Sequence, residues 1–169
     1  TNPVFINETT CLRAIAYSQE DDLSLPSFIE TNTYFINESH TVPILSISGD
    51  DIETILNGND QIISEGNFEY FDENINLIDE SYGEFNEHGG LSNYYDQRGL
   101  DYVVRDQFGY DYQIEHQLFR TKDRDEFERI MFKGAAGDNY PFAYSNNPGS
   151  GAHIRDAYVQ SLSQIGDLR

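Results

Sequence analysis

The sequence of 169 residues contains one cysteine, one methionine, two lysines and no tryptophan. The single cysteine, Cys11, has no partner in the chain, so an internal disulfide is excluded and cysteine usage indicates no particular compartment. No run approaches the roughly 18 apolar residues of a membrane-spanning helix, so a membrane span is not expected. The chain also lacks zinc-finger spacing, a nucleophile elbow and a Walker-type phosphate loop.

The start of the chain, Thr1-Asn2-Pro3, has neither an initiator methionine nor the basic and apolar segments of a secretory leader. We therefore expect the chain to be a processed or excised piece of a longer protein.

Positive charge is also scarce, because 10 lysines and arginines stand against 30 carboxylates and give a formal charge of −20. Phosphates would be repelled by such a surface, so nucleic-acid binding is not expected. The acidic surface could attract divalent cations or could simply be a solvated face. Hydrophobic residues make up 38% of the chain, with 11 Phe and 12 Tyr, which is enough for a packed core.

The few cations are unevenly distributed. Residues 1–97 contain 19 carboxylates and one basic residue, whereas residues 98–169 contain 11 carboxylates and nine basic residues. The second region is therefore where an anion could bind. The alternative is that these cations pair with neighbouring acids, and we favour this alternative for residues 122–126.

Alternating apolar residues and turn signals predict a mostly β protein of the α+β class. We expect the end of a β-sandwich module over residues 1–38, followed by an antiparallel-sheet lobe with a terminal helix over residues 39–169. The strands are predicted at residues 10–17, 28–36, 42–48, 67–72, 74–78, 99–105, 110–119 and 127–133. Asp50 is expected to cap a short helix at residues 52–56, and Ser150 to cap the terminal helix, which Gly166 ends.

Glycine-rich turns at strand ends provide the candidate functional site. Backbone N–H groups in such turns can hold phosphate oxygens, and nearby cations strengthen the attraction. The candidate nucleotide-binding residues are Gly89, Gly90, Arg98, Lys133, Asp138 and Arg155. The alternative is that Asp138 and Asp156 pair with Lys133 and Arg155 and only tie the loop to the helix.

The metal-binding residues are not assigned from the sequence. Asp50, Asp51 and Asp60 bracket one turn, and residues 106–111 place two carboxylates across a glycine. Neither segment matches an EF-hand loop, so a structural Ca²⁺ ion is left open.

Six segments, in order, resemble motifs of the CotH family, the spore-coat-protein-H-like secreted kinases. Residues 42–48 resemble its "LPVLSIS" strand, and residues 87–92 resemble its "IHGGxS" turn. The other segments are residues 68–72, 97–100, 127–138 and 154–162, and the specificity of the resemblance comes from the order of all six. The resemblance covers about residues 42–169. Residues 3–36 resemble the end of a chitobiase C-terminal or fibronectin-III-associated β-module, which would make residues 1–38 part of a fibronectin-III-like domain.

The resemblance implies a kinase-like fold that binds ATP with Mg²⁺ and phosphorylates secreted or surface proteins. It also implies a secreted or cell-surface location. In this interpretation Arg98 and Lys133 contact phosphate, the two glycines allow close approach, and Asp138 orients Lys133 or its loop. This chain departs from the family by having Arg98 at the basic position before the third strand and Lys133 at the turn arginine.

The family's metal-binding and catalytic aspartates lie beyond the segment that matches the terminal helix. We therefore assign no catalytic residue, and we do not expect this chain to catalyse phosphoryl transfer alone. The alternative function is a non-enzymatic extracellular or cell-surface structural or adhesion module, stabilised by calcium. A third and weaker alternative is carbohydrate binding by the first module.

Overall fold

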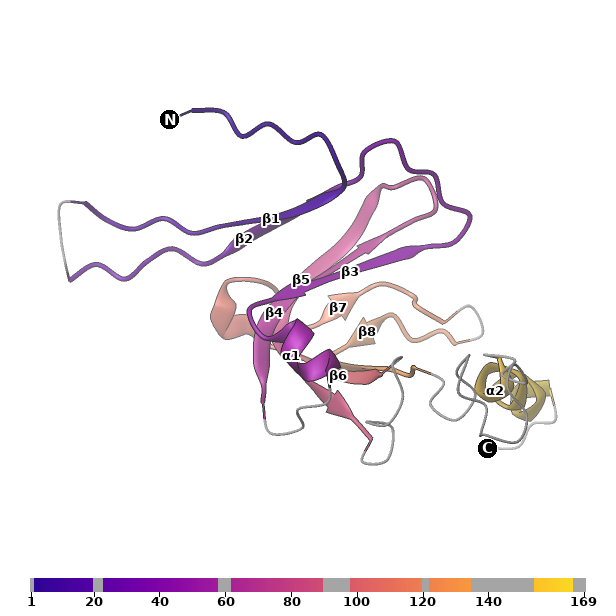
Figure 1. Cartoon of the computed structure of the whole chain (residues 1–169). Helices are drawn as coiled ribbons and strands as arrows, with labels where there is room; N and C mark the ends of the chain where they lie inside the picture. The colour runs from indigo at the N-terminus through magenta and orange to yellow at the C-terminus, as the bar shows by residue number, and fades with distance from the viewer. Residues whose placement is uncertain are drawn as a thin grey trace. The chain divides into compact units, whose positions relative to one another are not determined.

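The computed structural model describes residues 2–19, 23–57, 62–89, 98–119, 122–134 and 154–165 (Figure 1). These residues form mostly β-structure, with antiparallel strand pairs and a terminal helix, which confirms the predicted mostly β member of the α+β class. The largest sheet in the described part has five strands in the order β3-β4-β5-β6-β9. Two further sheets have two strands each, β1-β2 and β7-β8.

The chain divides into two compact units, and each is composed of three segments. Unit 1 comprises residues 1–50, 65–84 and 103–129, and unit 2 comprises residues 51–64, 85–102 and 130–169. The predicted boundary between residues 38 and 39 remains a prediction. Strands β1 and β2 belong to the same unit as all of β3 and most of β4.

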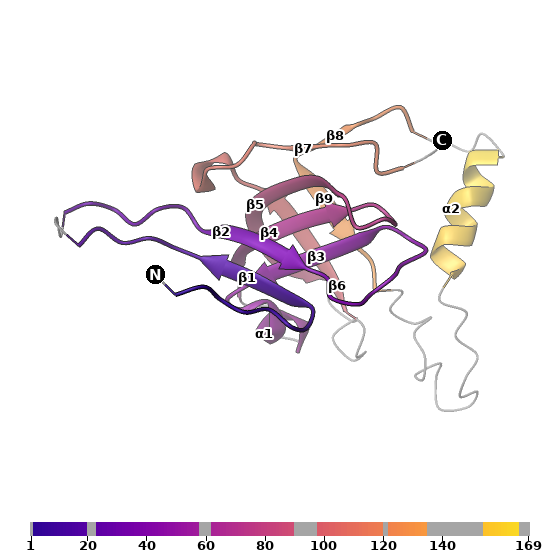
Figure 2. The same ribbon diagram turned by 90° about the horizontal axis from the view of Figure 1, so that it is seen from above.

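Unit 1 is built around antiparallel strand pairs. Strand β1 (Thr10–Ala14) pairs with β2 (Glu30–Tyr34), and β3 (Ile44–Gly49) pairs with β4 (Ser64–Phe71) (Figure 2). The register places Gly66 opposite Gly49, and a Cβ atom at Gly66 would lie 2.2 Å from the Ser48 carbonyl oxygen. The pairing of β3 with β4 therefore requires a glycine at position 66.

The sheet continues through β5 (Leu77–His88), β6 (Gly99–Val104) and β9 (Arg129–Phe132). The Arg105 amide donates to the Tyr82 carbonyl oxygen at 2.9 Å, while Gly99 lies against His88, so β5 and β6 run antiparallel. A short 3₁₀ helix, η2 (Asp106–Phe108), follows β6 and leads to the small pair β7 (Ile114–Glu115) and β8 (Glu126–Phe127).

Each unit has its own set of buried apolar side chains. In unit 1 these are Phe68, Phe71, Tyr82, Val104, Ile114 and Phe127. In unit 2 they are Ile52, Ile55, Phe85, Leu100, Tyr102 and Ile130. The rings of Phe85 and Tyr102, both fully buried, stack with centroids 4.3 Å apart across β5 and β6.

Polar contacts attach β2 to the other strands of unit 1. The Thr33 hydroxyl donates to Glu69 at 2.6 Å and lies 2.7 Å from the Ser46 hydroxyl, while the Thr33 amide donates to Glu69 at 3.0 Å. Thr31 donates to Asn67, and both residues are fully buried. Because a buried polar group is costly when unpaired, these bonds fix how β2 packs on β3 and β4.

Two helices occur in the described part of unit 2. Helix α1 (Ile52–Leu56) buries Ile52 and Ile55. The N-cap residue is Asp51, and its side chain makes no cap hydrogen bond. Asp50, the predicted cap, lies one residue earlier and pairs with Arg13 instead. Helix α2 (Arg155–Ile165) leaves Tyr158 and Leu162 exposed. The predicted cap Ser150 and the stop Gly166 lie outside the described residues.

Candidate phosphate site at one end of the sheet

Three of the six predicted site residues lie at neighbouring strand ends in unit 2, and the surroundings of Gly99 show how these strand ends are arranged. A Cβ atom at Gly99 would lie 3.0 Å from the Phe132 carbonyl oxygen and 3.3 Å from the His88 Cβ. The start of β6 is therefore flanked by the end of β5 on one side and the end of β9 on the other. Gly89 directly follows β5, Arg98 directly precedes β6 and Lys133 directly follows β9. The fold therefore brings these three backbone positions to the same sheet end.

Arg98 forms an ion pair with Glu87, the penultimate residue of β5. The Nη1 atom of Arg98 lies 3.7 Å from the Glu87 Oε1, and the two side chains are 12% and 2% exposed. Both oxygens of Glu87, and Nε and Nη1 of Arg98, are buried, and within the part of the chain that the structure describes they have no hydrogen-bond partner. Removing either partner would leave an uncompensated buried charge, so each side chain holds the other in place.

A second polar pair links the same end of β5 to β6. The Nδ1 atom of His88 is 3.4 Å from Oδ1 of Asp101, and the two side chains are 29% and 11% exposed. His88 is the last residue of β5 and Asp101 is the third residue of β6. The sheet end therefore combines two acidic side chains, an arginine and a histidine within two adjacent strands.

Gly89 follows β5 with a φ angle of 88°. This left-handed conformation is accessible to glycine at little cost and strained for other residues, which explains a glycine directly after the strand. A glycine in this conformation can also turn its backbone N–H toward a bound anion. Gly90, the next residue of the predicted site, lies outside the described residues.

The remaining predicted residues are placed only in part. Lys133 follows β9 and is exposed. Asp138 lies outside the described residues. Arg155 begins α2, but its side chain is outside the described part, so its approach to the sheet end remains a prediction.

The sequence-based prediction did not include Glu87, His88 or Asp101 in the site. The signal for them was the strand register, because residues that face one another across β5 and β6 become neighbours only when the pairing is known. In the sequence, residues 87–90 indicate a turn through their two glycines, and this pattern does not mark the acid and the imidazole before them.

The suggested calcium segments remain without structural support. Among the residues that the structure describes, no three His, Cys, Asp or Glu side chains come together as a metal site would require. Asp50 pairs with Arg13, while Asp60 lies outside the described range. Within the same residues, no helix has the length and apolar character needed to cross a membrane.

No protein-family model matches the chain, and no curated protein or solved structure matches it.

Proposed function

We propose that this end of the sheet binds the phosphate groups of a nucleotide, with ATP and Mg²⁺ as the natural ligand pair. In this proposal the chain is part of a secreted or cell-surface, kinase-like protein of the CotH type, which phosphorylates extracellular proteins. The observation that carries the proposal is the arrangement around Gly99, which brings the positions of Gly89, Arg98 and Lys133 to neighbouring strand ends.

The chemistry of these residues suits a polyphosphate. A guanidinium group offers a planar pair of donors to phosphate oxygens, whereas an ammonium group acts as a mobile point charge. In this proposal Arg98, held in place by Glu87, binds one phosphate, and the exposed Lys133 approaches another. The left-handed backbone of Gly89 can turn an N–H group toward a phosphate oxygen.

Glu87 limits the strength of this site. Its carboxylate compensates part of the Arg98 charge, so Arg98 acts as an oriented hydrogen-bond donor more than as a free positive charge. Magnesium bound to the nucleotide would neutralise the remaining phosphate charge. Phosphoryl transfer additionally needs carboxylates that hold the metal and orient the nucleophile. We assign no residue of this chain to that role.

Calorimetric titration of the full chain with Mg-ATP tests the proposal. We expect Arg98→Ala and Lys133→Ala to weaken binding by about tenfold or more, since each removes a charged hydrogen bond to phosphate. Lys122→Ala is the matched control because Lys122 is also exposed but lies in unit 1. Unchanged affinity in both test variants, or an equal loss in the control, would remove the site.

A second candidate function is a non-enzymatic extracellular or surface module for structure or adhesion. The observation that favours it is the pairing of Arg98 with Glu87, because an arginine already paired can serve stability alone. Parallel titrations with Ca²⁺ and with Mg-ATP separate the two candidates. Calcium binding together with no nucleotide binding would favour the structural module.

A further inference from the structure

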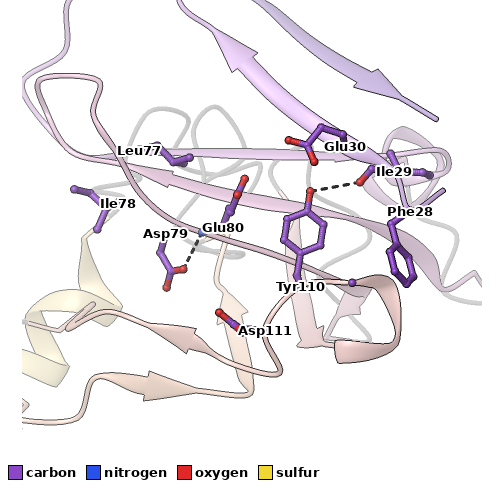
Figure 3. A pocket seen from close by; sticks show the side chains of 10 residues that line it. Phe28, Ile29, Glu30, Leu77, Ile78, Asp79, Glu80, Tyr110 and Asp111 are labelled. Atoms are coloured by element: carbon purple, nitrogen blue, oxygen red, sulfur yellow. Dashed lines mark hydrogen bonds between the residues drawn. The ribbon is translucent and has the colours of Figure 1, made fainter. Parts of the chain in front are cut away.

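A cavity of about 670 Å³ lies within unit 1 (Figure 3). Its lining residues include none of the residues of the proposed phosphate site. Its walls come from the segment that enters β2, from the first half of β5 and from the loop that follows η2. The volume falls in the range of small-molecule sites. Its residues that carry the argument are Phe28, Glu30, Asp79, Glu80, Tyr110 and Asp111.

The charges on this cavity are all negative. Four of its ten lining residues are acidic, and none is a lysine, an arginine or a histidine. Burial raises the pKa of Glu80, and the negative charges of Glu30, Glu69 and Asp79 raise it further. Among the described residues no cation offsets this repulsion at Glu80, so a positively charged group would stabilise its ionised form.

Asp79 is held in a fixed orientation beside Glu80. Its two oxygens accept hydrogen bonds from the backbone amides of Glu80, at 2.8 Å, and Glu115, at 2.6 Å. Burial nevertheless raises the pKa of Asp79. The backbone amides therefore fix the orientation of this carboxylate, while burial disfavours its ionised form. A cation bound beside it would stabilise the ionised form.

Aromatic side chains provide an observation independent of charge. The Tyr110 hydroxyl donates to the Ile29 carbonyl oxygen at 3.4 Å, so its ring stands at the cavity wall near Glu30 (Figure 3). The Phe28 ring packs so closely on Gly109 that a Cβ there would lie 2.4 Å from the ring, and Gly109 has a φ angle of 91°. Ring faces beside carboxylates are the surroundings that favour ammonium and guanidinium groups.

We infer that this cavity binds an organic cation, namely an ammonium or guanidinium group. The cavity is larger than a metal ion needs, and the described carboxylates form no three-ligand metal cluster. The cation can belong to a free amine or to a lysine or arginine side chain of another protein. The inference does not depend on the proposed nucleotide function, since it concerns different residues in a different unit.

The full chain is titrated at low salt with 1,5-diaminopentane and with the capped tripeptide acetyl-Gly-Lys-Gly-amide, and binding is followed by NMR shift changes. The same tripeptide with norleucine in place of lysine is the neutral control probe. Binding of the diamine alone identifies a free amine as the ligand, and binding of the lysine peptide alone identifies a protein side chain. Either result supports the inference, provided that the norleucine peptide does not bind.

Variants localise the binding. We expect Glu80→Gln and Asp111→Asn each to weaken binding by about tenfold, and Tyr110→Leu to weaken it roughly threefold. Glu128→Gln removes the same charge from an exposed position of unit 1 that does not line the cavity, and should change the affinity less than twofold. Circular dichroism checks that each variant is folded.

The inference is wrong if neither cationic probe binds, if the norleucine peptide binds equally, or if Glu128→Gln has the same effect as Glu80→Gln. Binding of Ca²⁺ that is lost in Glu80→Gln, without amine binding, would also overturn it in favour of a metal site.

Discussion

Ile75 adopts a left-handed backbone conformation, with a φ angle of 64°, in the turn between β4 and β5. The turn is organised by Asp72, whose carboxylate accepts hydrogen bonds from the amides of Asn74, at 2.9 Å, and Asn76, at 2.8 Å. The Asn76 side chain also donates to Asp72 and is the largest cause that lowers the pKa of Asp72. The strain at Ile75 is therefore imposed by the bonds around it.

Ile75→Asn should stabilise the protein, because asparagine tolerates the left-handed region and a β-branched residue does not. We expect a gain of about 1 kcal/mol in the free energy of unfolding, measured by urea denaturation. Asn37, which has a φ angle of 58°, shows an asparagine in the same conformation. The control Leu77→Asn, at an exposed position of β5, should not stabilise, and a destabilised Ile75→Asn would contradict the account.

Glu80→Gln should also stabilise the ligand-free protein at neutral pH. Because the pKa of Glu80 is raised on folding, its ionised form opposes folding, and stability falls as the pH rises from the ordinary glutamate pKa to the raised one. Removing the charge should add about 0.5 kcal/mol at pH 7, a small value because the side chain is partly screened by solvent.

Below the ordinary pKa of glutamate the advantage of Glu80→Gln should disappear, since a protonated glutamate resembles glutamine. Denaturation curves of both proteins across this pH range check the sign. An advantage that grows as the pH falls would show that Glu80 takes part in a stabilising interaction that the structure does not reveal.

At the level of elements, β2 is held by hydroxyl and carboxylate groups more than by apolar side chains. Thr33→Val removes the hydroxyl that contacts both Glu69 and Ser46 and leaves the Glu69 carboxylate, which is 2% exposed, with one bond fewer. We expect a loss of about 2 kcal/mol in the free energy of unfolding. Asn32→Val, at the exposed neighbouring position of the same strand, should change it by less than about 0.5 kcal/mol. Equal effects of the two changes would mean that the polar contacts add nothing.

Gly66→Ala tests the close approach of β3 and β4. A methyl group there would collide with the Ser48 carbonyl oxygen, which is backbone and cannot rotate away. We expect a loss of about 2 kcal/mol or more in thermal or urea unfolding, typical of an overpacked site. Glu73→Ala, at an exposed position, is the control and should have little effect. A tolerated Gly66→Ala would contradict the register of this strand pair.

The sequence indicated the helices and the strands in which apolar residues alternate clearly. It did not indicate the strand bounds that are set by the backbone conformation of the neighbouring turns. The segments 10–17, 28–36, 42–48 and 99–105 all overlap observed strands, and residues 52–56 form the predicted short helix. By contrast, residues 110–119 contain only the two-residue strand β7, because the backbone bends before it at residues 112 and 113 and after it at residue 116. Residues 74–76 belong to the turn fixed by Asp72, so the next strand begins at Leu77 and extends to His88.

The sequence alone points to the glycines and the cations of the candidate site, but it does not point to its acidic residues. Gly89, Arg98 and Lys133 are marked by residue type alone, since glycines and cations stand out in an acidic chain. Glu87 could not be recognised among 30 carboxylates, because its significance comes from burial beside Arg98 across two strands. The aromatic and acidic cavity is assembled from three segments far apart in the sequence, so no local pattern indicates it.

At the scale of the whole molecule, the charge of −20 opposes compaction. Screening by salt reduces repulsion between carboxylates more than it weakens the few ion pairs. We expect the thermal midpoint to rise by about 3 °C between about 0.05 M and 0.5 M NaCl, which corresponds to about 1 kcal/mol for a chain of this size. A midpoint that falls with added salt would show that ion pairs such as that of Arg105 with Glu84, at 2.6 Å, dominate the electrostatic balance.

The central claim is that the end of the sheet around Gly99 binds phosphate. It is tested most directly by following the backbone amide signals of the ¹⁵N-labelled chain during titration with Mg-ATP. The account predicts saturable shifts at Gly89, Gly99 and Lys133, and the loss of these shifts in Arg98→Ala. No shift at these three amides, or equal shifts in the Arg98→Ala variant, would contradict it.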